Sequence, residues 1–336
     1  LLIGTVALLN NKDKFNNLQL LVIDEQHKFG VSQRNSINDS NYNLTPHIIS
    51  MSATPIPRTV ALSIFANYKI VTLQVPTNNQ SPKITKLINL NQNYTINYLK
   101  KQILQKLENK KQIIIIVPRI KDSIKNNNSK LANIITVYKQ YSNDPLFANY
   151  EISFIHGQMP SDAKAKIMNK MNKSEIDILI STTVIEVGVD LPQASTIVIY
   201  NADGFSISQL HQLRGRVGRN RTLVKQAFCF LLYNSPIKEN SYKKLKALVK
   251  YTDGFELSEI DLKLRGEGDI LGKIQSGKKS NLKIMRILES KDLLKLSYKL
   301  ANKYINSDYF NYSDVKKLTK NSQQIYINTN DFLNKI

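Results

Sequence analysis

The stretch LQLLVIDEQHKFG, residues 18–30, joins a run of apolar residues to the acidic tetrapeptide Asp24-Glu25-Gln26-His27. The apolar run predicts a buried strand, so the tetrapeptide follows the carboxyl end of that strand. Open parallel α/β sheets bind their ligands at this edge. There one carboxylate can hold Mg²⁺ while its neighbour orients or deprotonates a water, as hydrolysis of a nucleoside triphosphate requires. An ordinary acidic turn after a strand is the competing interpretation.

Further apolar, β-branched runs alternate with stretches of helical periodicity along the chain. This alternation is typical of parallel βαβ units and predicts an α/β fold. The runs predicted as strands are Leu18–Ile23, His47–Ser52, Ile113–Val117, Glu151–Ile155, Asp177–Ser181, Thr196–Tyr200 and Ala227–Tyr233. After the last of them the sequence predicts charged helices and turns, with helical periodicity around Asp292–Tyr304.

A change of composition divides the chain. The stretch VPTNNQSPKITK contains two prolines and few apolar residues, which predicts a linker over residues 76–86. Too few strands precede it for a complete doubly wound domain, so residues 1–75 are expected to be the C-terminal half of such a domain, cut off from its front strands. Residues 87–234 are expected to form a second sheet domain. Residues 235–280 are expected to form a helical hairpin with its loop, and residues 281–336 a helical C-terminal segment.

Composition excludes several classes of protein. The 336 residues include one cysteine and four histidines, which rules out an internal disulfide and disfavours a structural zinc site. The longest aliphatic run, Ile113–Val117, is far shorter than the roughly 20 residues of a membrane-spanning helix, so a cytoplasmic protein without membrane contact is expected. The chain opens on Leu1 without a methionine or a signal peptide, so we expect a C-terminal fragment of a longer protein.

The charge of the chain is strongly basic. Lys and Arg total 47 against 26 Asp and Glu, and the net charge of +21 suggests a polyanionic partner such as nucleic acid. Codon choice in an AT-rich genome explains the abundant lysine equally well. It does not explain why four of the nine arginines lie between Arg214 and Arg221. This clustering indicates a need for the bidentate guanidinium, which lysine cannot replace.

The segment SQLHQLRGRVGRNR, residues 208–221, is the most specific in the chain. Arg216 and Arg219 are three residues apart, so within a helix both guanidinium groups would face one target, as a pair of arginine fingers does. A generic basic helix on a solvated face is the alternative. It does not explain two glycines inside a helical turn, each of which costs roughly 1 kcal/mol relative to alanine.

Another strand end adds small polar residues. DILISTTVIEVGVDLP, residues 177–192, places Thr182, Thr183, Gly188 and Asp190 after a buried strand. Hydroxyl groups there can meet phosphates, the glycine permits close approach of the backbone, and the acid can accept a hydrogen bond from a ribose hydroxyl. A plain strand and loop is a serious alternative for this segment.

Two further segments give weaker indications of a binding site. HIISMSATPIPRT places Ser52 and Thr54 after a predicted strand, although Ser or Thr before proline is also common in ordinary turns. The segment that best approximates a phosphate-binding GxxxxGK[ST] loop is GKIQSGKK at Gly272–Lys279, which has lysine where a hydroxyl must hold Mg²⁺ and follows no buried strand. We therefore reject it as a phosphate loop, and we expect no rapid ATP hydrolysis from the chain alone.

Together these motifs resemble superfamily 2 helicases, whose two RecA-like domains bind ATP, in both order and spacing. Over residues 1–280 the resemblance is to the RecG family of bacterial ATP-dependent DNA helicases. It rests on DEQHKFGVSQR, MSATPIPRTVALS, FIHGQM, STTVIEVGVDLP, GFSISQLHQLRGRVGR and DGFELSEIDLKLRGEGDILGKIQSG. The phosphate loop and N-terminal wedge domain of the family are absent from the sequence, and the linker lacks the Gly-Arg of many members.

The resemblance implies ATP and Mg²⁺ as cofactors and assigns roles by position. Those at the site of hydrolysis are Asp24 for Mg²⁺, Glu25 for the attacking water, Gln212 near the γ-phosphate, Arg216 and Arg219 as fingers, and Gly188 and Asp190 for nucleotide binding. The coupling residues are Gln26, His27, Ser52, Thr54, Arg265 and Gln275. The DNA contacts are Thr5, Thr183, Glu186 and Arg265.

The expected fold is therefore two RecA-like parallel-sheet domains, the first truncated, followed by the hairpin and helical segment. The resemblance implies a monomeric 3′-to-5′ DNA translocase that remodels stalled forks and Holliday junctions. Its partners would be branched double-stranded DNA and, as a further candidate, single-stranded DNA-binding protein. The transcription-repair coupling factor resembles the chain over the same span, and a non-catalytic DNA-binding remnant of a split gene also fits these residues.

Overall fold

A computed structural model of the chain describes residues 1–5, 8, 18–25, 46–52, 71, 81–118, 132–182, 191–265, 291–307, 311 and 313, with the side chains of 262, 265, 291–295 and 298 left out. The chain divides into two units. The first comprises Leu1–Ala53, Arg58–Tyr68 and Glu267–Ile336, and the second comprises Thr54–Pro57 and Lys69–Gly266.

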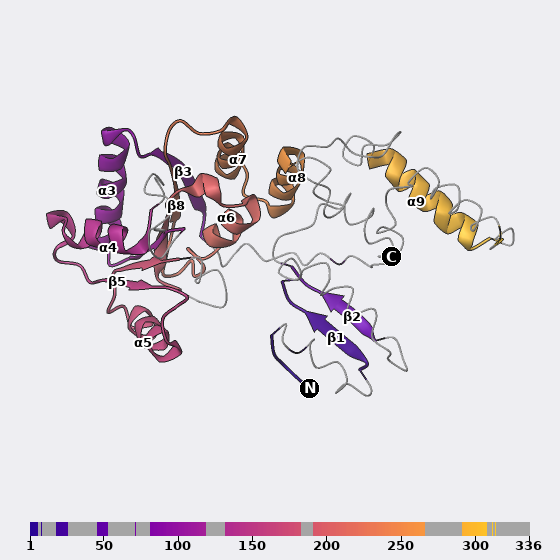
Figure 1. The fold of residues 1–336 in the computed structure, drawn as a ribbon, viewed down its shortest axis with the longest axis horizontal. Coiled ribbons are helices and arrows are strands. Elements are labelled where there is room, and N and C mark those ends of the chain that lie inside the picture. The colour runs from indigo at the N-terminus through magenta and orange to yellow at the C-terminus, as the bar shows by residue number, and fades with distance from the viewer. Residues whose placement is uncertain are drawn as a thin grey trace, which may run out of the picture. The chain divides into compact units, whose positions relative to one another are not determined.

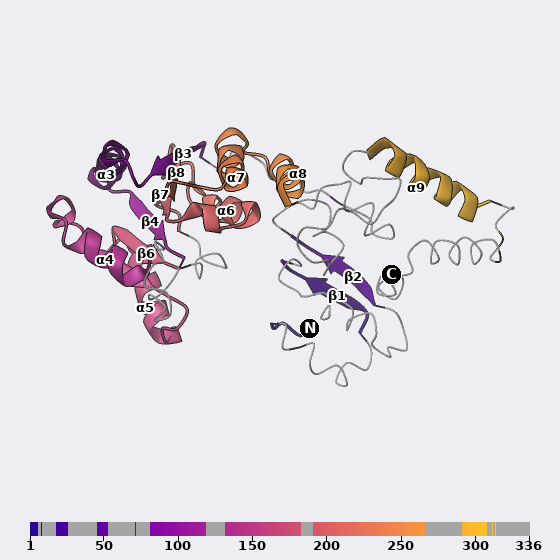
Figure 2. The same cartoon turned by 45° about the horizontal axis from the view of Figure 1, so that its top comes forward.

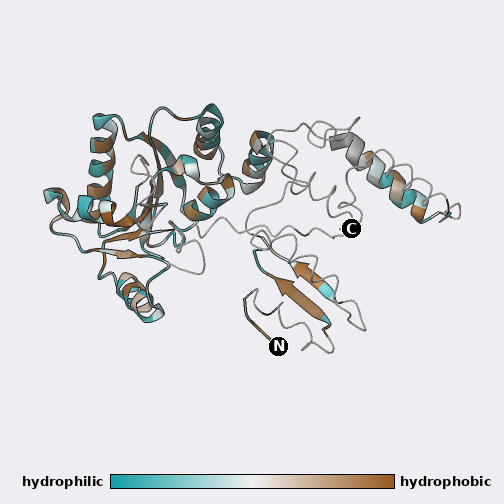
Figure 3. Cartoon of the chain, in the orientation of Figure 1, coloured by the Kyte–Doolittle hydropathy of each residue, from teal (hydrophilic) through white to brown (hydrophobic). Residues whose placement is uncertain are grey.

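The described part of the first unit contains a short parallel sheet (Figure 1). Strand β1 (Leu20–Ile23) pairs with β2 (His47–Ser50) in a register that places Leu20 beside His47. Figure 3 shows both strands as mostly hydrophobic. The unit also contains helix α9 (Lys291–Ile305), which matches the helical periodicity found in the sequence.

The second unit is built on a six-stranded sheet in which all neighbouring strands are parallel, in the order β3-β8-β7-β4-β6-β5. Its strands are β3 (Lys83–Asn89), β4 (Gln112–Ile116), β5 (Ile152–Ile155), β6 (Ile178–Ser181), β7 (Ala194–Ile199) and β8 (Ala227–Tyr233). All five residues of β4 are buried, as expected of a central parallel strand that is covered on both faces.

Helices cover the two faces of this sheet (Figures 1 and 2). Helices α3 and α4 contribute to one apolar cluster, together with Ile113 and Ile115 of β4. Helices α5 to α8 contribute to the other, together with Ile114 and Ile116. The six helices are α3 (Asn93–Glu108), α4 (Ile134–Ser142), α5 (Ser161–Asn172), α6 (Ile207–Arg214), α7 (Glu239–Lys250) and α8 (Gly254–Arg265). The alternation of β4 side chains thus divides the core into two layers.

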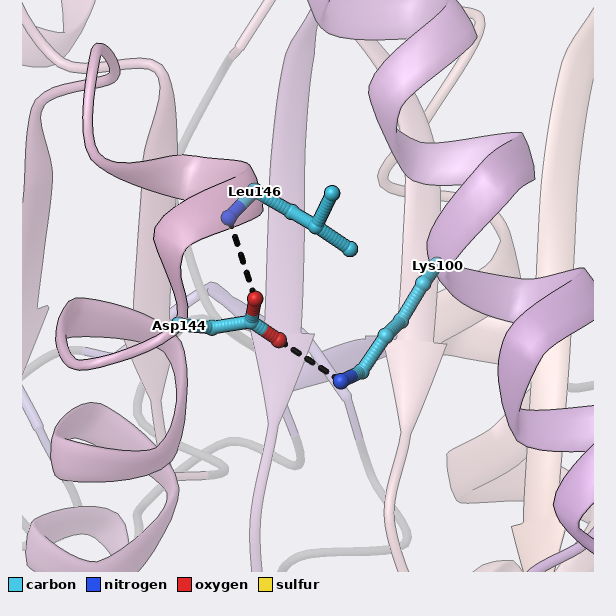
Figure 4. A network of polar contacts seen from close by, with 3 residues as sticks. All are labelled: Lys100, Asp144 and Leu146. Carbon is cyan, nitrogen blue, oxygen red and sulfur yellow. Dashed lines mark hydrogen bonds and ion pairs between the residues drawn. The ribbon is translucent and has the colours of Figure 1, made fainter.

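An ion pair joins α3 to the short 3₁₀ helix η4 (Pro145–Phe147) in the second unit. The Nζ of Lys100 lies 2.6 Å from Oδ2 of Asp144, and Oδ1 of Asp144 accepts a hydrogen bond from the backbone N–H of Leu146 (Figure 4). These contacts lower the pKa of the Asp144 carboxyl, with the hydrogen bond from Lys100 as the main cause. The aspartate therefore caps η4 and ties it to α3 at once.

The α/β prediction is confirmed, and each run predicted as a strand overlaps an observed strand. The predicted linker is wrong at its C-terminal end, because β3 begins at Lys83 and pairs along its whole length with β8. The first residues of the strand sequence KITKLIN were assigned to the linker because two prolines, Pro76 and Pro82, stand before them. The domain boundaries otherwise stay predictions.

No helix in the described part of the chain is long and apolar enough to cross a membrane.

Candidate functional site

The acidic pair of the first unit lies at the carboxyl end of β1, as predicted. Asp24 is exposed and Glu25 half-buried directly after the strand. Glu25 has a φ of 50°, in the left-handed region, and its N–H donates a 2.8 Å hydrogen bond to Oδ1 of Asp24. Such a backbone is uncommon for a residue other than glycine and is concentrated at functional sites. The chain therefore turns sharply between the two carboxyl groups.

The adjacent strand brings Ser52 to the same edge of the small sheet. The N–H of Met51 donates to the carbonyl of Ile23 at 2.8 Å, which continues the parallel ladder to the last residues of both strands. Asp24, Glu25 and Ser52 are thus exposed or half-buried groups at neighbouring strand ends. Carboxylate and hydroxyl oxygens are suitable ligands for Mg²⁺, so this donor set fits the ion that the sequence predicts.

Helix α6 positions Gln212 in the second unit. Ser206 caps the helix in a reciprocal capping box with Gln209, which fixes where the helix begins. Ile207, Leu210 and Leu213 then bury one side of the helix in the sheet core. Gln212 is only 9% exposed, and its Nε2 has no hydrogen-bond partner among the described residues. A buried amide donor of this kind is available to an anionic ligand.

Arg216 and Arg219 do not lie within a helix, contrary to the prediction. Helix α6 ends at Arg214, and both arginines lie in the turn that follows it, which we call the arginine turn (residues 215–221). Gly218 sets the direction of this turn with a φ of +67°. The helical spacing rule failed because α6 ends before Arg216, and the left-handed Gly218 between the two arginines prevents a helical path from continuing there.

Tertiary contacts hold the arginine turn in place. The N–H of Gly218 donates to the carbonyl of Ala194 at 3.0 Å, and its own carbonyl accepts from the N–H of Ser81 at 2.9 Å. A Cβ at position 218 would lie 2.6 Å from Cβ of Ala227, so the site has no room for a side chain. Ala194 and Ala227 are the first residues of β7 and β8, so the turn lies at the amino ends of these strands.

Arg214 is a buried residue that the sequence analysis did not single out. It is 3% exposed, and its guanidinium donates to the carbonyls of Leu248, Tyr251 and Thr252 at 2.8, 2.9 and 3.1 Å. These carbonyls lie at the end of α7 and in the connection to α8. Arg214 thereby fastens the helix before the arginine turn to the α7–α8 pair. The crowding of arginines in this segment was its only sequence signal.

Positive groups gather around Arg214. The Nδ1 of His211 lies 3.1 Å from Nη2 of Arg214, a distance suited to a neutral imidazole that accepts from the guanidinium. Burial first, and then the charges of Arg214 and Lys83, lower the pKa of His211 to about 4. Burial and the same arginine, followed by Arg219, lower the pKa of Lys83 to about 8. This region therefore favours neutral or anionic neighbours.

Several predicted site residues lie outside the described part of the chain: Gln26, His27, Thr54, Thr183, Glu186, Gly188, Asp190 and Gln275. Arg265 is the last residue of α8, and its side chain is not described. Thr5 is exposed near the first residue, and its carbonyl accepts from the N–H of Leu8. The described residues thus form two groups: Asp24, Glu25 and Ser52 at the strand ends of the first unit, which we call the acidic edge, and the arginine turn with Gln212 in the second unit.

Comparison with protein families covers most of the chain. Residues 1–62 match the DEAD/DEAH box helicase family, and residues 94–221 match the helicase conserved C-terminal domain. Residues 251–324 match the C-terminal part of domain 3 of the ATP-dependent DNA helicase RecG. The acidic edge and the arginine turn thus fall in two different helicase families' models.

Two RecG sequences and one solved RecG structure also match most of the chain. The ATP-dependent DNA helicase RecG of Aquifex aeolicus is 40% identical over 324 residues, which cover 94% of this chain and 39% of that protein. RecG of Staphylococcus epidermidis is 36% identical over 324 residues, which cover 95% of this chain and 45% of that protein. A solved structure of RecG bound to a three-way DNA junction matches with a TM-score of 0.57 at 31% identity, over 87% of this chain and 36% of that chain. The chain spans less than half the length of these relatives.

Proposed function

Because the chain belongs to the RecG family and corresponds to its C-terminal portion, we propose that it forms the C-terminal part of an ATP-driven 3′-to-5′ DNA translocase. Its substrates are stalled forks and Holliday junctions, in line with the solved relative bound to a three-way junction. The match to domain 3 of RecG favours this function over that of a transcription-repair coupling factor. The proposal includes a monomeric, cytoplasmic protein, with single-stranded DNA-binding protein as a further partner.

We assign a separate role in ATP hydrolysis to each of the described site residues. Asp24 would hold Mg²⁺, and Glu25, which directly follows it with a left-handed backbone, would orient the attacking water and accept its proton. Gln212 donates its buried amide to the γ-phosphate. Arg216 and Arg219 contact the phosphate oxygens, where their planar guanidinium groups match the oxygen geometry. When bound, Mg²⁺-ATP supplies the phosphoryl group whose transfer to water drives movement.

Three groups of residues are assigned by resemblance. Gly188 and Asp190 bind the nucleotide, and Thr5, Thr183, Glu186 and Arg265 contact DNA. The coupling residues are Gln26, His27, Ser52, Thr54, Arg265 and Gln275. Arg214 adds a structural basis for coupling, because it fastens α6 directly to the connection before α8, at whose end Arg265 lies.

The observation that carries the proposal is the arginine turn. Gly218 is bonded on both sides and has no space for a Cβ, so the turn holds two arginines beside a helix that carries a buried, unpartnered amide among the described residues. A solvated basic surface would need neither the left-handed glycine nor the buried amide. The arrangement fits recognition of a compact anion such as a terminal phosphate.

The direct test uses the longer protein that contains this chain. We expect it to unwind a three-way DNA junction in the presence of Mg²⁺-ATP, and we expect the 336-residue chain alone to bind the junction without hydrolysing ATP at a helicase rate. The second expectation follows because the sequence has no GxxxxGK[ST] loop to hold the β- and γ-phosphates. Rapid DNA-stimulated hydrolysis by the 336-residue chain, or no junction unwinding by the longer protein, would contradict the proposal.

A further inference from the structure

The chain approaches the second sheet in direct contact with the arginine turn. Ser81 lies two residues before β3, within the stretch predicted as the linker, and is 4% exposed. Its N–H donates to the carbonyl of Gly218 at 2.9 Å, and its hydroxyl donates to the carbonyl of Val224. The same residue therefore bonds to the turn at Gly218 and to the segment that leads away from it.

Neighbouring contacts make this attachment rigid. The carbonyl of Pro82 accepts from the N–H of Ala227 at 2.9 Å, which locks the residue after Ser81 to the first residue of β8. A Cβ added at Gly218 would lie 3.0 Å from Cβ of Ser81, so the backbone of the turn is seated against the serine. On its other side Gly218 is bonded to Ala194 of β7. The carbonyl group of Gly218 cannot move without breaking the bond to Ser81.

We infer that Ser81 is a positioning residue for Arg216 and Arg219, and that it connects the end of the linker to these two arginines. Arg219 directly follows Gly218, and Arg216 lies two residues before it, so a shift of the Gly218 carbonyl displaces the backbone on both sides. Only the expected effect on ATP hydrolysis rests on the proposed function. The attachment itself concerns residues of one unit and can be tested without nucleotide.

The first test measures the mobility of the arginine turn in the 336-residue chain. Trypsin cleaves after arginine, so its rate of cleavage after Arg219 and Arg221, relative to cleavage after Lys173 beyond α5, reports local opening of the turn. Ser81→Ala keeps the backbone bond to Gly218 but removes the hydroxyl bond to Val224, which anchors the segment after the turn. This loss should raise the relative rate about five- to tenfold. Ser81→Cys, which keeps a weak donor of similar shape, should restore most of the protection.

The matched control is Thr85→Val, which removes a buried hydroxyl from β3 without touching the turn. We expect the relative cleavage rate of this variant to equal that of the unaltered chain. Equal rates in Ser81→Ala and Thr85→Val, or faster cleavage at Lys173 in the same proportion, would overturn the inference, because the serine would then contribute only to general stability.

The second test measures ATP hydrolysis in the longer protein. A loosened arginine turn should lower kcat for Ser81→Ala by about tenfold with little change in KM, since fingers act mainly in the transition state, and Ser81→Cys should recover part of the loss. An unchanged kcat in Ser81→Ala would overturn the connection to the fingers. If Arg216→Ala and Arg219→Ala also leave kcat unchanged, the proposed function is wrong. The trypsin result would then still show whether Ser81 holds the arginine turn in place.

Discussion

The two sheets of the molecule differ in how they hold their polar groups. In the first, Leu20, Val22 and Ile49 are about half exposed, at 52, 52 and 50%, and the acidic pair is placed by strand pairing and one local hydrogen bond. In the second, the central strand β4 is fully buried, and the arginine turn is bonded to residues far away in the sequence. The acidic edge is therefore fixed by local structure and the arginine turn by tertiary packing.

This difference has a consequence for substitutions. A change at the acidic edge should affect chemistry with little effect on folding, because Asp24 is exposed and Glu25 half-buried. A change at the arginine turn or near Arg214 should affect both, because these residues are packed against the sheet and against α7. The predictions below test this separation, in order of decreasing expected effect.

Glu25→Gln should abolish ATP turnover in the longer protein, with a loss in kcat of about 10³-fold or more, because the amide keeps the shape but cannot accept the proton. Binding of Mg²⁺-ATP should persist, since Asp24 remains. The measurement is steady-state hydrolysis together with equilibrium binding of the nucleotide, and the melting temperature should stay within a degree or two of the unaltered protein. Full turnover in this variant would show that the acidic edge is an ordinary turn.

Gly218→Ala should destabilise the second unit by roughly 2–5 kcal/mol, because it combines a left-handed backbone with a contact of 2.6 Å to Ala227. Gly215→Ala is the matched control. Gly215 has a right-handed φ of −64°, and a Cβ there would lie 3.0 Å from the carbonyl oxygen of Gln212, so the substitution there should cost less than at Gly218. Urea unfolding monitored by circular dichroism compares the two, and an equal cost at both positions would show that the turn is not held as described.

The stability of the second unit should fall as the pH drops from 6.5 to 4. The pKa of His211 is about 4 in the folded chain against the usual 6.5, so the unfolded chain binds more protons in this window. Lys83, Arg214 and Asp253 are the charged groups that act on it, and the loss should be on the order of 2 kcal/mol. His211→Gln should remove this part of the pH dependence, which the difference in melting temperature between the two proteins would reveal. If the melting temperatures of both proteins fall equally with pH, a group other than His211 causes the pH dependence.

Asp144→Asn should have the smallest effect, a loss of about 0.5–1 kcal/mol, because it weakens a partly exposed ion pair with Lys100 but keeps an oxygen that can cap η4. Glu239→Gln is the comparison, since its pair with Lys243 is largely exposed. A larger change at Glu239 than at Asp144 would contradict the structural role of the contact between α3 and η4.

Local rules predicted the features that depend on local structure. Alternation and apolar runs located the strands, and the rule for strand ends placed Asp24 and Glu25 correctly. The same rules missed β3, where neighbouring prolines suggested a linker, and they placed Arg216 and Arg219 in a helix. Gly218 is left-handed because Ala194 and Ser81 bond to it from either side, a fact that no local sequence pattern contains. The cluster of arginines included Arg214, but its structural role was not predicted for the same reason, since its carbonyl partners lie 34 to 38 residues further along the chain.

The most direct measurement of the central claim compares ATP turnover with DNA affinity in the longer protein carrying Arg216→Lys or Arg219→Lys. If the arginine turn acts on the nucleotide, kcat should fall about 10³-fold in each variant, because a point charge cannot replace the planar guanidinium across the γ-phosphate. The affinity for a three-way junction and its dependence on salt should stay unchanged. Near-normal turnover combined with weaker binding and a shallower salt dependence would contradict the account, because the turn would then be a DNA-binding surface.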